Sequence, residues 1–415
     1  MVRRARLGVV AAFAVLCACA GGPELGEIEP PARAAFRQVE IDHGAQLAAA
    51  GDCFSCHTTD DGYAYAGGRP VKTPFGAVFA TNITPAHQTG IGGYAREAFV
   101  RAMRQGVRRD GAHLYPAFPY DHFSATSDED LSALYAFLMT RQAVEQKTPP
   151  NRLVPPVGFR PVIAVWKALF FRPTPFRPVS GKSAEWNRGA YLVDSLGHCG
   201  GCHTPHNWLG AEQRKKALDG GWAEGWYAPP LNGRSPAAVP WTVDRLRTYL
   251  KTGLDPAHAA AAGPMGEVTR QLTKASDADV HAMAVFLADQ MDGVGRSAPI
   301  ERAAEAARAH PQGAALFAGA CAACHDPGAP MMLDGRPPLQ LGTPLHEDDP
   351  RDVIAIILKG LKSPSGSSGP YMPSFEVLTD DQVSDVAAYL RARFSDKPAW
   401  TNLTAAVSKA RKEAS

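Results

Sequence analysis

Three stretches of the chain repeat one pattern of apolar and polar positions. Each stretch begins with Gly-Ala-x-Leu, and the glycines are Gly44, Gly189 and Gly313. A middle helix that ends at a glycine is then predicted over 96–106, 243–253 and 352–360. Each stretch closes with an acidic turn and an apolar helix: SDEDLSALYAFL, SDADVHAMAVFL and TDDQVSDVAAYL. The pattern predicts three helical units of one kind.

The closing helices share further features that predict how each unit packs. Their expected N-caps, followed by acidic residues in the first turn, are Ser127, Ser276 and Thr379. Their equivalent aromatic residues are Phe137, Phe286 and Tyr389. A glycine on the first helix that faces such an aromatic residue lets two helices cross closely. The apolar core of each unit is small for a domain of this size.

This pattern divides the chain into three all-α domains, at about 37–145, 183–295 and 303–400. The Pro-rich linker 146–182 contains an apolar run, 162–171, with Arg160, Lys167 and Arg172 around it. We favour a helix packed between domains there; the alternative is a patch for a membrane surface or a partner. The tail 401–415 is too polar for a strong anchor.

The N-terminus has the pattern of a secretory signal peptide over residues 1–20. Arg3, Arg4 and Arg6 precede an apolar stretch, 7–20, which at about 14 residues is too short to span a membrane. Two processing routes fit. Residues 18–20 form an A-x-A site with cleavage before Gly21, whereas residues 16–19 resemble a lipoprotein signal that would leave a lipidated Cys19. Either route predicts an exported protein.

Charge and the lengths of the apolar runs argue against nucleic-acid binding and against a membrane-spanning helix in the mature chain. The 415 residues include 43 basic and 41 acidic side chains, a formal charge of +2, without a long run of one sign. This balance excludes nucleic-acid binding by bulk electrostatics. Because no segment reaches about 18 uninterrupted apolar residues, we expect no spanning helix in the mature chain.

Three CxxCH motifs carry the chemistry: CFSCH, CGGCH and CAACH. This is the attachment pattern of haem c, in which two thiols form thioethers with the porphyrin and the histidine binds the iron. A zinc site would need a fourth ligand, and no other CxxC pair supplies one. The motifs predict three covalent haem c groups. Their attachment residues are Cys53, Cys56, Cys199, Cys202, Cys321 and Cys324, and their proximal ligands are His57, His203 and His325.

A methionine thioether is expected on the sixth position of two irons, in the loop before the last helix. Met265 and Met372 occupy that loop, against the alternative that they are core residues. The first unit has Phe118 where methionine is expected, and Met103 is expected in the core. His122 is therefore our candidate sixth ligand there. The alternative is a surface histidine and an open or water-bound iron.

Two smaller expectations concern the other histidines. The backbone at Pro205 and Pro327, two residues beyond the haem histidine, could accept the imidazole N–H. The remaining histidines are expected in loops or on the surface rather than as ligands. They are His198, His206, His258, His281, His310 and His346.

Longer strings around these motifs resemble those of the triple-haem cytochrome c subunits of bacterial membrane-bound dehydrogenases. The strings are TPFGAVFATNITP, GVRRDGAHLYPAFPYDHF, EWNRGAYLVDSLGHCGGCHTPHN and YMPSFEVLTDDQVSDVAAYLRARF. The resemblance implies an all-α fold of three tandem class I-like cytochrome c domains, each wrapped around a covalent haem c. It also implies the same proximal histidines and the two methionine ligands, whereas many members have methionine at the position of Phe118.

The resemblance further implies a place on the periplasmic side of the bacterial inner membrane. Its members accept electrons from a catalytic subunit of the quinoprotein, flavin or molybdopterin type and pass them to ubiquinone or another cytochrome. We therefore expect an electron-transfer subunit without a catalytic site of its own. Two alternatives stay open: a peroxidase-like haem enzyme that uses an open first iron with His113 or His122, and an oxidase-linked cytochrome c subunit.

Overall fold

The computed structural model describes residues 22–292, 301–329, 337–362 and 372–414. The predicted signal peptide, which includes Cys19, lies outside these residues. The chain divides into two compact units. Among the described residues, the first unit comprises 22–182, Tyr191–His198 and Lys274–Ser276, and the second comprises Ser183–Ala190, Cys199–Thr273 and the described residues of 277–414.

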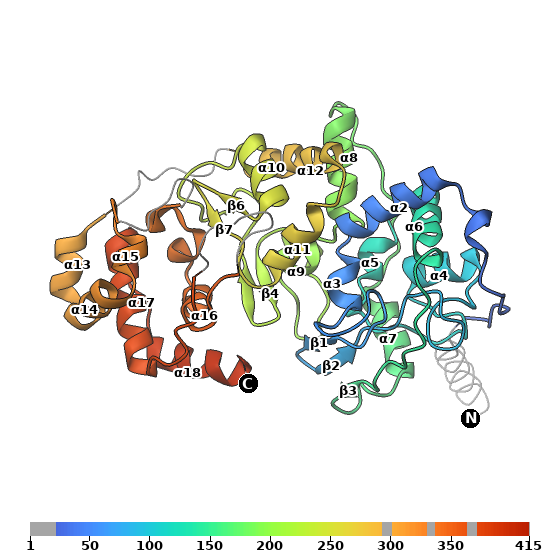
Figure 1. Cartoon of the computed structure of the whole chain (residues 1–415), viewed down its shortest axis with the longest axis horizontal. Coiled ribbons are helices and arrows are strands. Elements are labelled where there is room, and N and C mark those ends of the chain that lie inside the picture. Colours follow the sequence, from blue (N-terminus) through green and yellow to red (C-terminus); the bar gives the residue numbers. More distant parts are fainter. Residues whose placement is uncertain (1–21, 293–300, 330–336, 363–371, 415) are drawn as a thin grey trace, which may run out of the picture. The chain divides into compact units, whose positions relative to one another are not determined.

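The first unit is organised around helix α2, which crosses helix α6 (Figure 1). A three-stranded antiparallel sheet, in the order β1-β2-β3, lies beside the helices, and Pro70 pairs with Phe79 and Gly76 with Leu153. The elements are η1 (Arg33–Ala35), α2 (Gln38–Ala50), α3 (Cys53–His57), β1 (Pro70–Thr73), β2 (Gly76–Phe79), α4 (Arg96–Gln105), α5 (Tyr120–Phe123), α6 (Asp128–Met139), β3 (Arg152–Leu153) and α7 (Pro161–Phe170).

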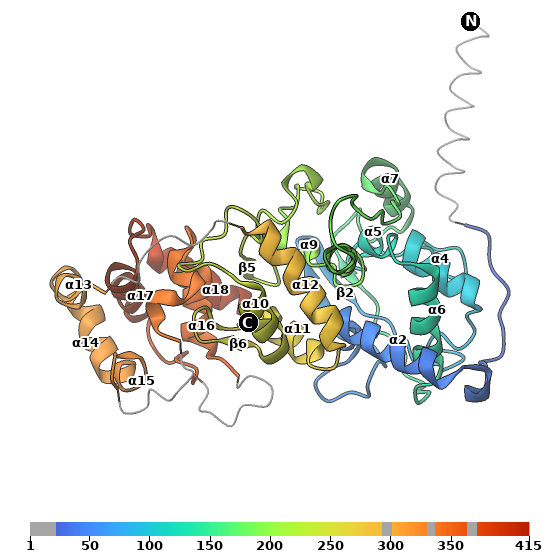
Figure 2. The same ribbon diagram turned by 90° about the horizontal axis from the view of Figure 1, so that it is seen from above.

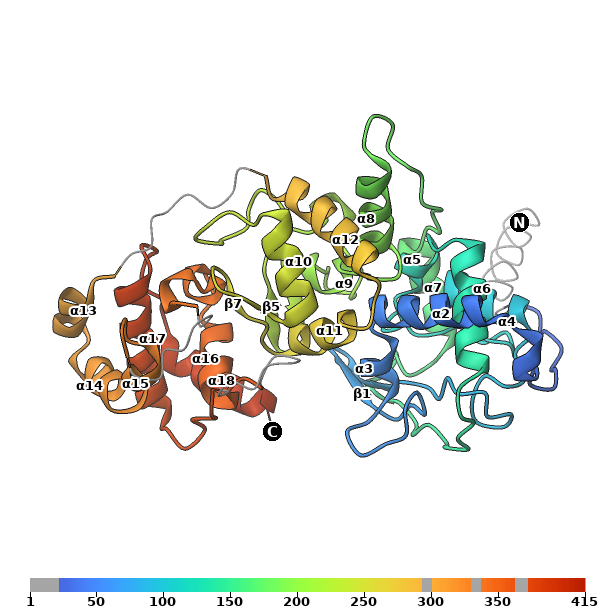
Figure 3. The same ribbon diagram turned by 45° about the horizontal axis from the view of Figure 1, so that its top comes forward.

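The second unit contains two further sets of helices, in which α10 packs on α12 and α14 packs on α17 (Figure 3). The last turn of α8 belongs to the first unit. The middle elements are α8 (Ala184–Asp194), α9 (Gly200–His203), η2 (Arg214–Lys216), β4 (Gly221–Ala223), β5 (Trp226–Ala228), α10 (Val243–Thr252), β6 (Leu254–Asp255), β7 (Ala259–Ala260), α11 (Pro264–Leu272) and α12 (Asp277–Gln290). The last elements are α13 (Ala303–Ala309), α14 (Pro311–Ala320), α15 (Ala322–His325), η3 (Leu339–Leu341), η4 (Thr343–His346), α16 (Arg351–Lys359), α17 (Asp380–Phe394) and α18 (Leu403–Ala414).

The predicted close crossing of first and last helices is confirmed at all three glycines. A Cβ added to Gly44 would lie 2.0 Å from the carbonyl oxygen of Ala133 and 2.8 Å from Cβ of Phe137. Gly189 and Gly313 have the same surroundings. The added Cβ would lie 2.9 Å from Cβ of Phe286 at Gly189, and 2.8 Å from Cβ of Tyr389 at Gly313. Only glycine fits where the two backbones approach this closely.

The ends of the helices also follow the sequence. Ser127 caps α6 by accepting a hydrogen bond from the backbone N–H of Asp130, and Thr379 caps α17 within a full capping box. The middle helices α4, α10 and α16 are followed by glycines with positive φ, at Gly106, Gly253 and Gly360. Each middle helix therefore ends at the glycine that the sequence pattern predicted.

The strands and the linker differ from the expected all-α fold. The described chain is largely helical, but it contains one small three-stranded sheet and two hairpins. Residues of the predicted linker 146–182 form β3 and α7, and both lie within the first unit. α7 lies beside α5 (Figure 2), where the Phe171 ring is 5.0 Å from that of Tyr120. No helix among the described residues is long and apolar enough to cross a membrane.

The expected polar tail 401–415 is instead a packed helix, α18. Val407 is fully buried, and it belongs to the same apolar cluster as Trp400 and Phe394. Arg411 fastens the helix by donating from Nε to Oδ1 of Asp380 at 2.7 Å. The core of this part of the second unit therefore extends beyond residue 400.

Candidate haem-binding sites

Each CxxCH motif forms a single helical turn. The backbone N–H of His203 donates to the carbonyl of Cys199 at 2.9 Å, and His325 makes the same bond to Cys321 at 2.9 Å. The first motif is the helix α3. In such a turn, side chains three and four residues apart lie on one face, so both thiols and the imidazole point to the same side. None of these six cysteines forms a disulfide, and each is half-buried.

The first two proximal histidines are oriented by backbone carbonyls. Nδ1 of His57 lies 2.6 Å from the carbonyl oxygen of Thr81, and Nδ1 of His203 lies 2.6 Å from that of Pro229. A carbonyl oxygen only accepts, so Nδ1–H is the donor in both cases. The unprotonated nitrogen of each ring is then Nε2, the atom that binds a metal in this arrangement.

The surroundings favour the neutral form of both rings. Burial lowers the pKa of His57, and the hydrogen bond to Thr81 opposes this shift only in part. Burial likewise lowers the pKa of His203 against the bond to Pro229. Burial also raises the pKa of the thiols, to about 12 for Cys53 and about 11 for Cys321. Neutral imidazole is the form that binds iron.

The two orienting carbonyls correct the expectation placed on Pro205. That residue lies two positions beyond His203, but the carbonyl that the ring uses belongs to Pro229, 26 residues along the chain. Thr81 follows β2 and Pro229 follows β5, so each carbonyl stands just after a β-hairpin. The hairpins, which the sequence analysis missed, therefore position the proximal histidines.

Arginines outside the motifs bind the helical turns of the first and third CxxCH motifs. Nη1 of Arg69 donates to the carbonyl oxygen of Ser55, inside the first motif, at 2.5 Å. In the third motif Asp326 follows His325 directly, and its Oδ1 lies 2.7 Å from Nη2 of Arg393 on α17. Because Arg393 is itself buried, this ion pair ties the end of the motif to the core helix.

The two candidate methionine ligands are half-buried and stand in well-defined backbone settings. Met265 lies in the first turn of α11, after Gly263, whose added Cβ would collide with the indole of Trp226. The backbone of Met372 accepts a hydrogen bond from Leu361 N–H at 2.9 Å, just after α16. Their assignment as iron ligands stays a prediction.

In the loop before the last helix, the first sequence repeat has Phe118 at the position where the other two repeats have the candidate ligands Met265 and Met372. The Phe118 ring is half-buried and lies 5.2 Å from that of Phe123. Nδ1 of His122 donates to the carbonyl oxygen of Asp194 at 2.8 Å, so Nε2 is its basic nitrogen. Met103 is buried in the core cluster, as expected. Ligation by His122 stays a prediction.

Two of the histidines expected in loops or on the surface are buried. His258 stacks on Trp241, with ring centroids 3.4 Å apart, and burial lowers its pKa to about 4. Nε2 of His346 lies 2.8 Å from the carbonyl oxygen of Gln340. Both side chains are core residues, and sequence spacing alone carries no signal for this.

The residues present fit haem c. Each motif offers two thiols that form no disulfide and an imidazole on one face of a turn, and in the first two motifs a carbonyl fixes the tautomer that leaves Nε2 available. Thioether formation consumes two thiols and leaves the imidazole for the iron.

Two cytochrome c family models match the chain. One, described as "Cytochrome c", matches residues 41–142, and the other, "Cytochrome C oxidase, cbb3-type, subunit III", matches residues 308–390.

Curated relatives match over nearly the whole chain. A nicotinate dehydrogenase subunit of Pseudomonas putida is 43% identical over 401 residues, which cover 94% of this chain but 33% of that protein. The "Fructose dehydrogenase cytochrome subunit" of Gluconobacter japonicus is 35% identical, covering 90% of this chain and 83% of that one. The "Gluconate 2-dehydrogenase cytochrome c subunit" of Pantoea cypripedii is 33% identical, covering 90% of each. The chain thus spans a third of the first relative and most of the other two.

Proposed function

Because this chain belongs to the family of cytochrome c subunits of dehydrogenases, we propose that it is the electron-transfer subunit of such a complex and binds three covalent haem c groups. It receives electrons from a catalytic subunit and delivers them to ubiquinone or a downstream cytochrome. It has no substrate chemistry of its own.

The observation that carries this proposal is the shared geometry of the CxxCH turns. Each places two thiols and one imidazole on the same face, where they hold one haem. A bound haem c supplies one-electron oxidation and reduction at iron. The chain's own part is to fix the proximal imidazole, as the carbonyls of Thr81 and Pro229 do, and to cover the opposite face with Met265, Met372 or His122.

The relatives favour one class of catalytic partner. Nicotinate is an N-heterocycle, and the relative named for its oxidation is 43% identical to this chain, against 33–35% for the sugar, sugar-acid and alcohol dehydrogenase subunits. A molybdopterin-type catalytic subunit is therefore the partner that we propose first. The match of residues 308–390 to a cbb3 oxidase subunit model supports the oxidase-linked alternative for that region alone.

The proposed location is the periplasmic side of the inner membrane. The signal-peptide pattern of residues 1–20 supports export, and the presence of haem c motifs supports an extracytoplasmic site of attachment. Lipidation of Cys19 is the proposed means of attachment, with cleavage before Gly21 as its alternative.

Haem content and electron flow test the proposal. A pyridine haemochrome assay with intact mass should give three covalent haems per chain. A catalytic subunit of the proposed molybdopterin type, once reduced by its substrate, should reduce the haems, and a ubiquinone analogue should reoxidise them. Fewer than three haems would contradict the cofactor assignment. Steady turnover of hydrogen peroxide without a partner would favour the haem-enzyme alternative.

A further inference from the structure

Helix α7 has an inverted distribution of apolar and charged side chains. Its single charged residue, Lys167, is 9% exposed, whereas Val165 and Leu169 are 50% and 61% exposed. Phe159, just before the helix, is 65% exposed. Helices on the surface of a soluble domain normally place their charges outward and their apolar residues inward. We call Phe159, Val165 and Leu169 the outer face of α7.

The inward direction of Lys167 has a clear cause. Its Nζ donates to the backbone carbonyls of Gln105 and Gly106, the latter at 3.3 Å, at the C-terminal end of α4. It also lies 5.0 Å from the centre of the Tyr120 ring. A cation at this end of a helix is favourable, so the lysine anchors α7 from beneath and leaves the outer face uncharged.

The segment that carries α7 is strongly basic, unlike the rest of the chain. Residues 146–182 contain seven basic side chains and no acidic one, so their formal charge is +7, against +2 for the whole chain. The basic residues are Lys147, Arg152, Arg160, Lys167, Arg172, Arg177 and Lys182. Arg152, Arg172 and Arg177 are exposed. An apolar helix face with basic residues around it matches the boundary between anionic headgroups and acyl chains.

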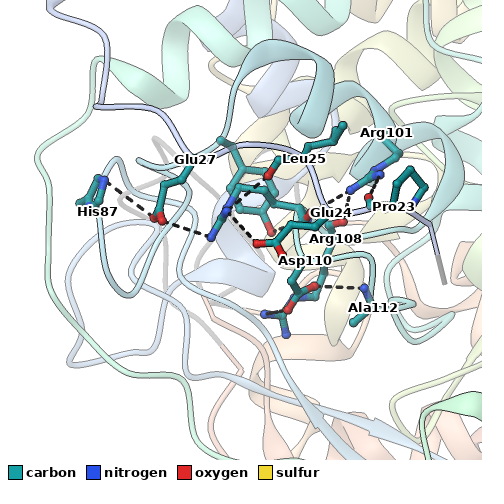
Figure 4. A network of polar contacts seen from close by, with 11 residues as sticks. Pro23, Glu24, Leu25, Glu27, His87, Arg101, Arg108, Asp110 and Ala112 are labelled. Atoms are coloured by element: carbon teal, nitrogen blue, oxygen red, sulfur yellow. Dashed lines mark hydrogen bonds and ion pairs between the residues drawn. The ribbon is translucent and has the colours of Figure 1, made fainter. Parts of the chain in front are cut away.

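The N-terminal residues 22–28 are tied down close to this helix. Gly22 N–H donates to the carbonyl of Gly111 at 3.1 Å, and Nη1 of Arg101 donates to the carbonyl of Pro23 at 2.5 Å (Figure 4). An alanine at Gly111 would place its Cβ 2.1 Å from the carbonyl oxygen of Gly22. The start of the described chain is therefore fixed on the loop 106–113.

The same loop holds α7. Nη1 of Arg160 donates to the carbonyl of His113 at 2.6 Å, and Lys167 reaches Gly106 at the other end of the loop. Cys19 precedes Gly22 by three residues, a reach of about 10 Å when extended. A lipid on Cys19 would therefore be attached within about 10 Å of Gly22, which is bound to the same loop as α7.

We propose that the outer face of α7 rests on an anionic phospholipid membrane and orients the subunit there, beside its N-terminal attachment. This inference rests on the proposed function and adds the surface by which the subunit meets the membrane. Lipid fits this face better than a protein partner does, because the segment is uniformly basic and is held by the same loop as Gly22, which follows the predicted lipid anchor by three residues.

The test uses the haem-loaded chain from Gly21 to Ser415, secreted with a foreign signal so that no acyl chain is present. Binding is measured by co-sedimentation with vesicles of phosphatidylcholine that contain or lack phosphatidylglycerol. Leu169→Glu should weaken binding to the anionic vesicles at least about tenfold, since it removes a large apolar contact and adds repulsion. Arg172→Gln with Arg177→Gln should weaken it by about fivefold for each charge.

The matched control is Val39→Glu. Val39 is 64% exposed on helix α2 of the same unit, so this variant likewise replaces an exposed aliphatic side chain by glutamate, and binding should not change. Equal losses for Leu169→Glu and Val39→Glu, or a parent chain that stays in the supernatant, would overturn the inference. A parent that ignores vesicles while Leu169→Glu disrupts assembly with the catalytic subunit would identify a protein interface instead.

Haem content and reduction by the partner are measured on the same samples. If three haems are present and reducible but the vesicles are not bound, the membrane inference alone fails. If the haems are missing or inert to the partner, the proposed function fails.

Discussion

Replacing Gly313 by alanine tests whether the close crossing of α14 and α17 is required for stability. The added Cβ would lie 2.1 Å from the carbonyl oxygen of Asp385 and 2.8 Å from Cβ of Tyr389, whereas ordinary van der Waals contact begins at 3.4 Å. The obstacle is a backbone atom within a helix, so no side-chain rotation relieves the overlap. The two helices must separate by more than about 1 Å.

The size of the effect follows from two opposing contributions. Overpacking of this kind destabilises by about 1–3 kcal/mol, while alanine in place of glycine inside a helix stabilises by about 1 kcal/mol. Because the clash at Gly313 is with main chain, we take the upper end of the first range. The expected net loss is about 2 kcal/mol, a decrease in Tm of roughly 10 °C for the transition of this region.

The matched control is Gly319→Ala, in the same helix. Gly319 has no atom within 4 Å of its added Cβ, so alanine should stabilise by up to about 1 kcal/mol. Both variants are compared with the parent by thermal unfolding of the haem-loaded chain, followed by circular dichroism. If Gly313→Ala and Gly319→Ala shift Tm in the same direction, the crossing does not restrain the helices and the reasoning is wrong.

Three further predictions concern ligands and pH. Met265→Ala and Met372→Ala should each lower the potential of one haem in a redox titration, because a thioether favours ferrous iron; Met103→Leu, a core change, should not. If His122 ligates the first iron, the parent should resist CO and show a low-spin bis-histidine signal by EPR, and His122→Ala should gain high-spin iron; a parent that already binds CO refutes this. Burial raises the pKa of Asp352 to about 7 from 3.8, so the folded state holds an extra proton and stability should fall as pH rises between about 4 and 7. Asp352→Asn should flatten that dependence in unfolding experiments, and an unchanged slope would exclude Asp352 as its source.

The features that could be predicted from the sequence are those set by short-range spacing. Each CxxCH turn is complete within five residues. The glycines that follow α4, α10 and α16 mark in the sequence where those helices end. The crossing glycines were predictable because the same glycine and aromatic positions occur three times. Repetition within one chain supplied information that a single copy would lack.

The features that could not be predicted depend on long-range contacts. Nothing near His57 or His203 identifies Thr81 or Pro229 as the carbonyl that each ring will use. Lys167 was expected among the charges around an apolar run, but the end of α4 draws it inward.

The helix α18 could have been predicted from the spacing of its apolar residues, although the average composition of the segment suggested an unpacked tail. Its apolar residues follow the spacing of one helix face, although the segment as a whole is polar. They are Leu403, Ala406, Val407 and Ala410.

The distance along the chain between the first two attachment turns and their orienting carbonyls bears on the biogenesis of the protein. The thiols and histidine of a motif are neighbours in any conformation, so covalent attachment needs no tertiary structure. The carbonyls of Thr81 and Pro229 arrive only when loops of more than 20 residues have closed and the hairpins have formed. Attachment can therefore precede folding, whereas the proximal imidazole acquires its fixed tautomer and orientation only at the end. A newly made chain would therefore carry its haems before the imidazoles of His57 and His203 were held in their final orientation.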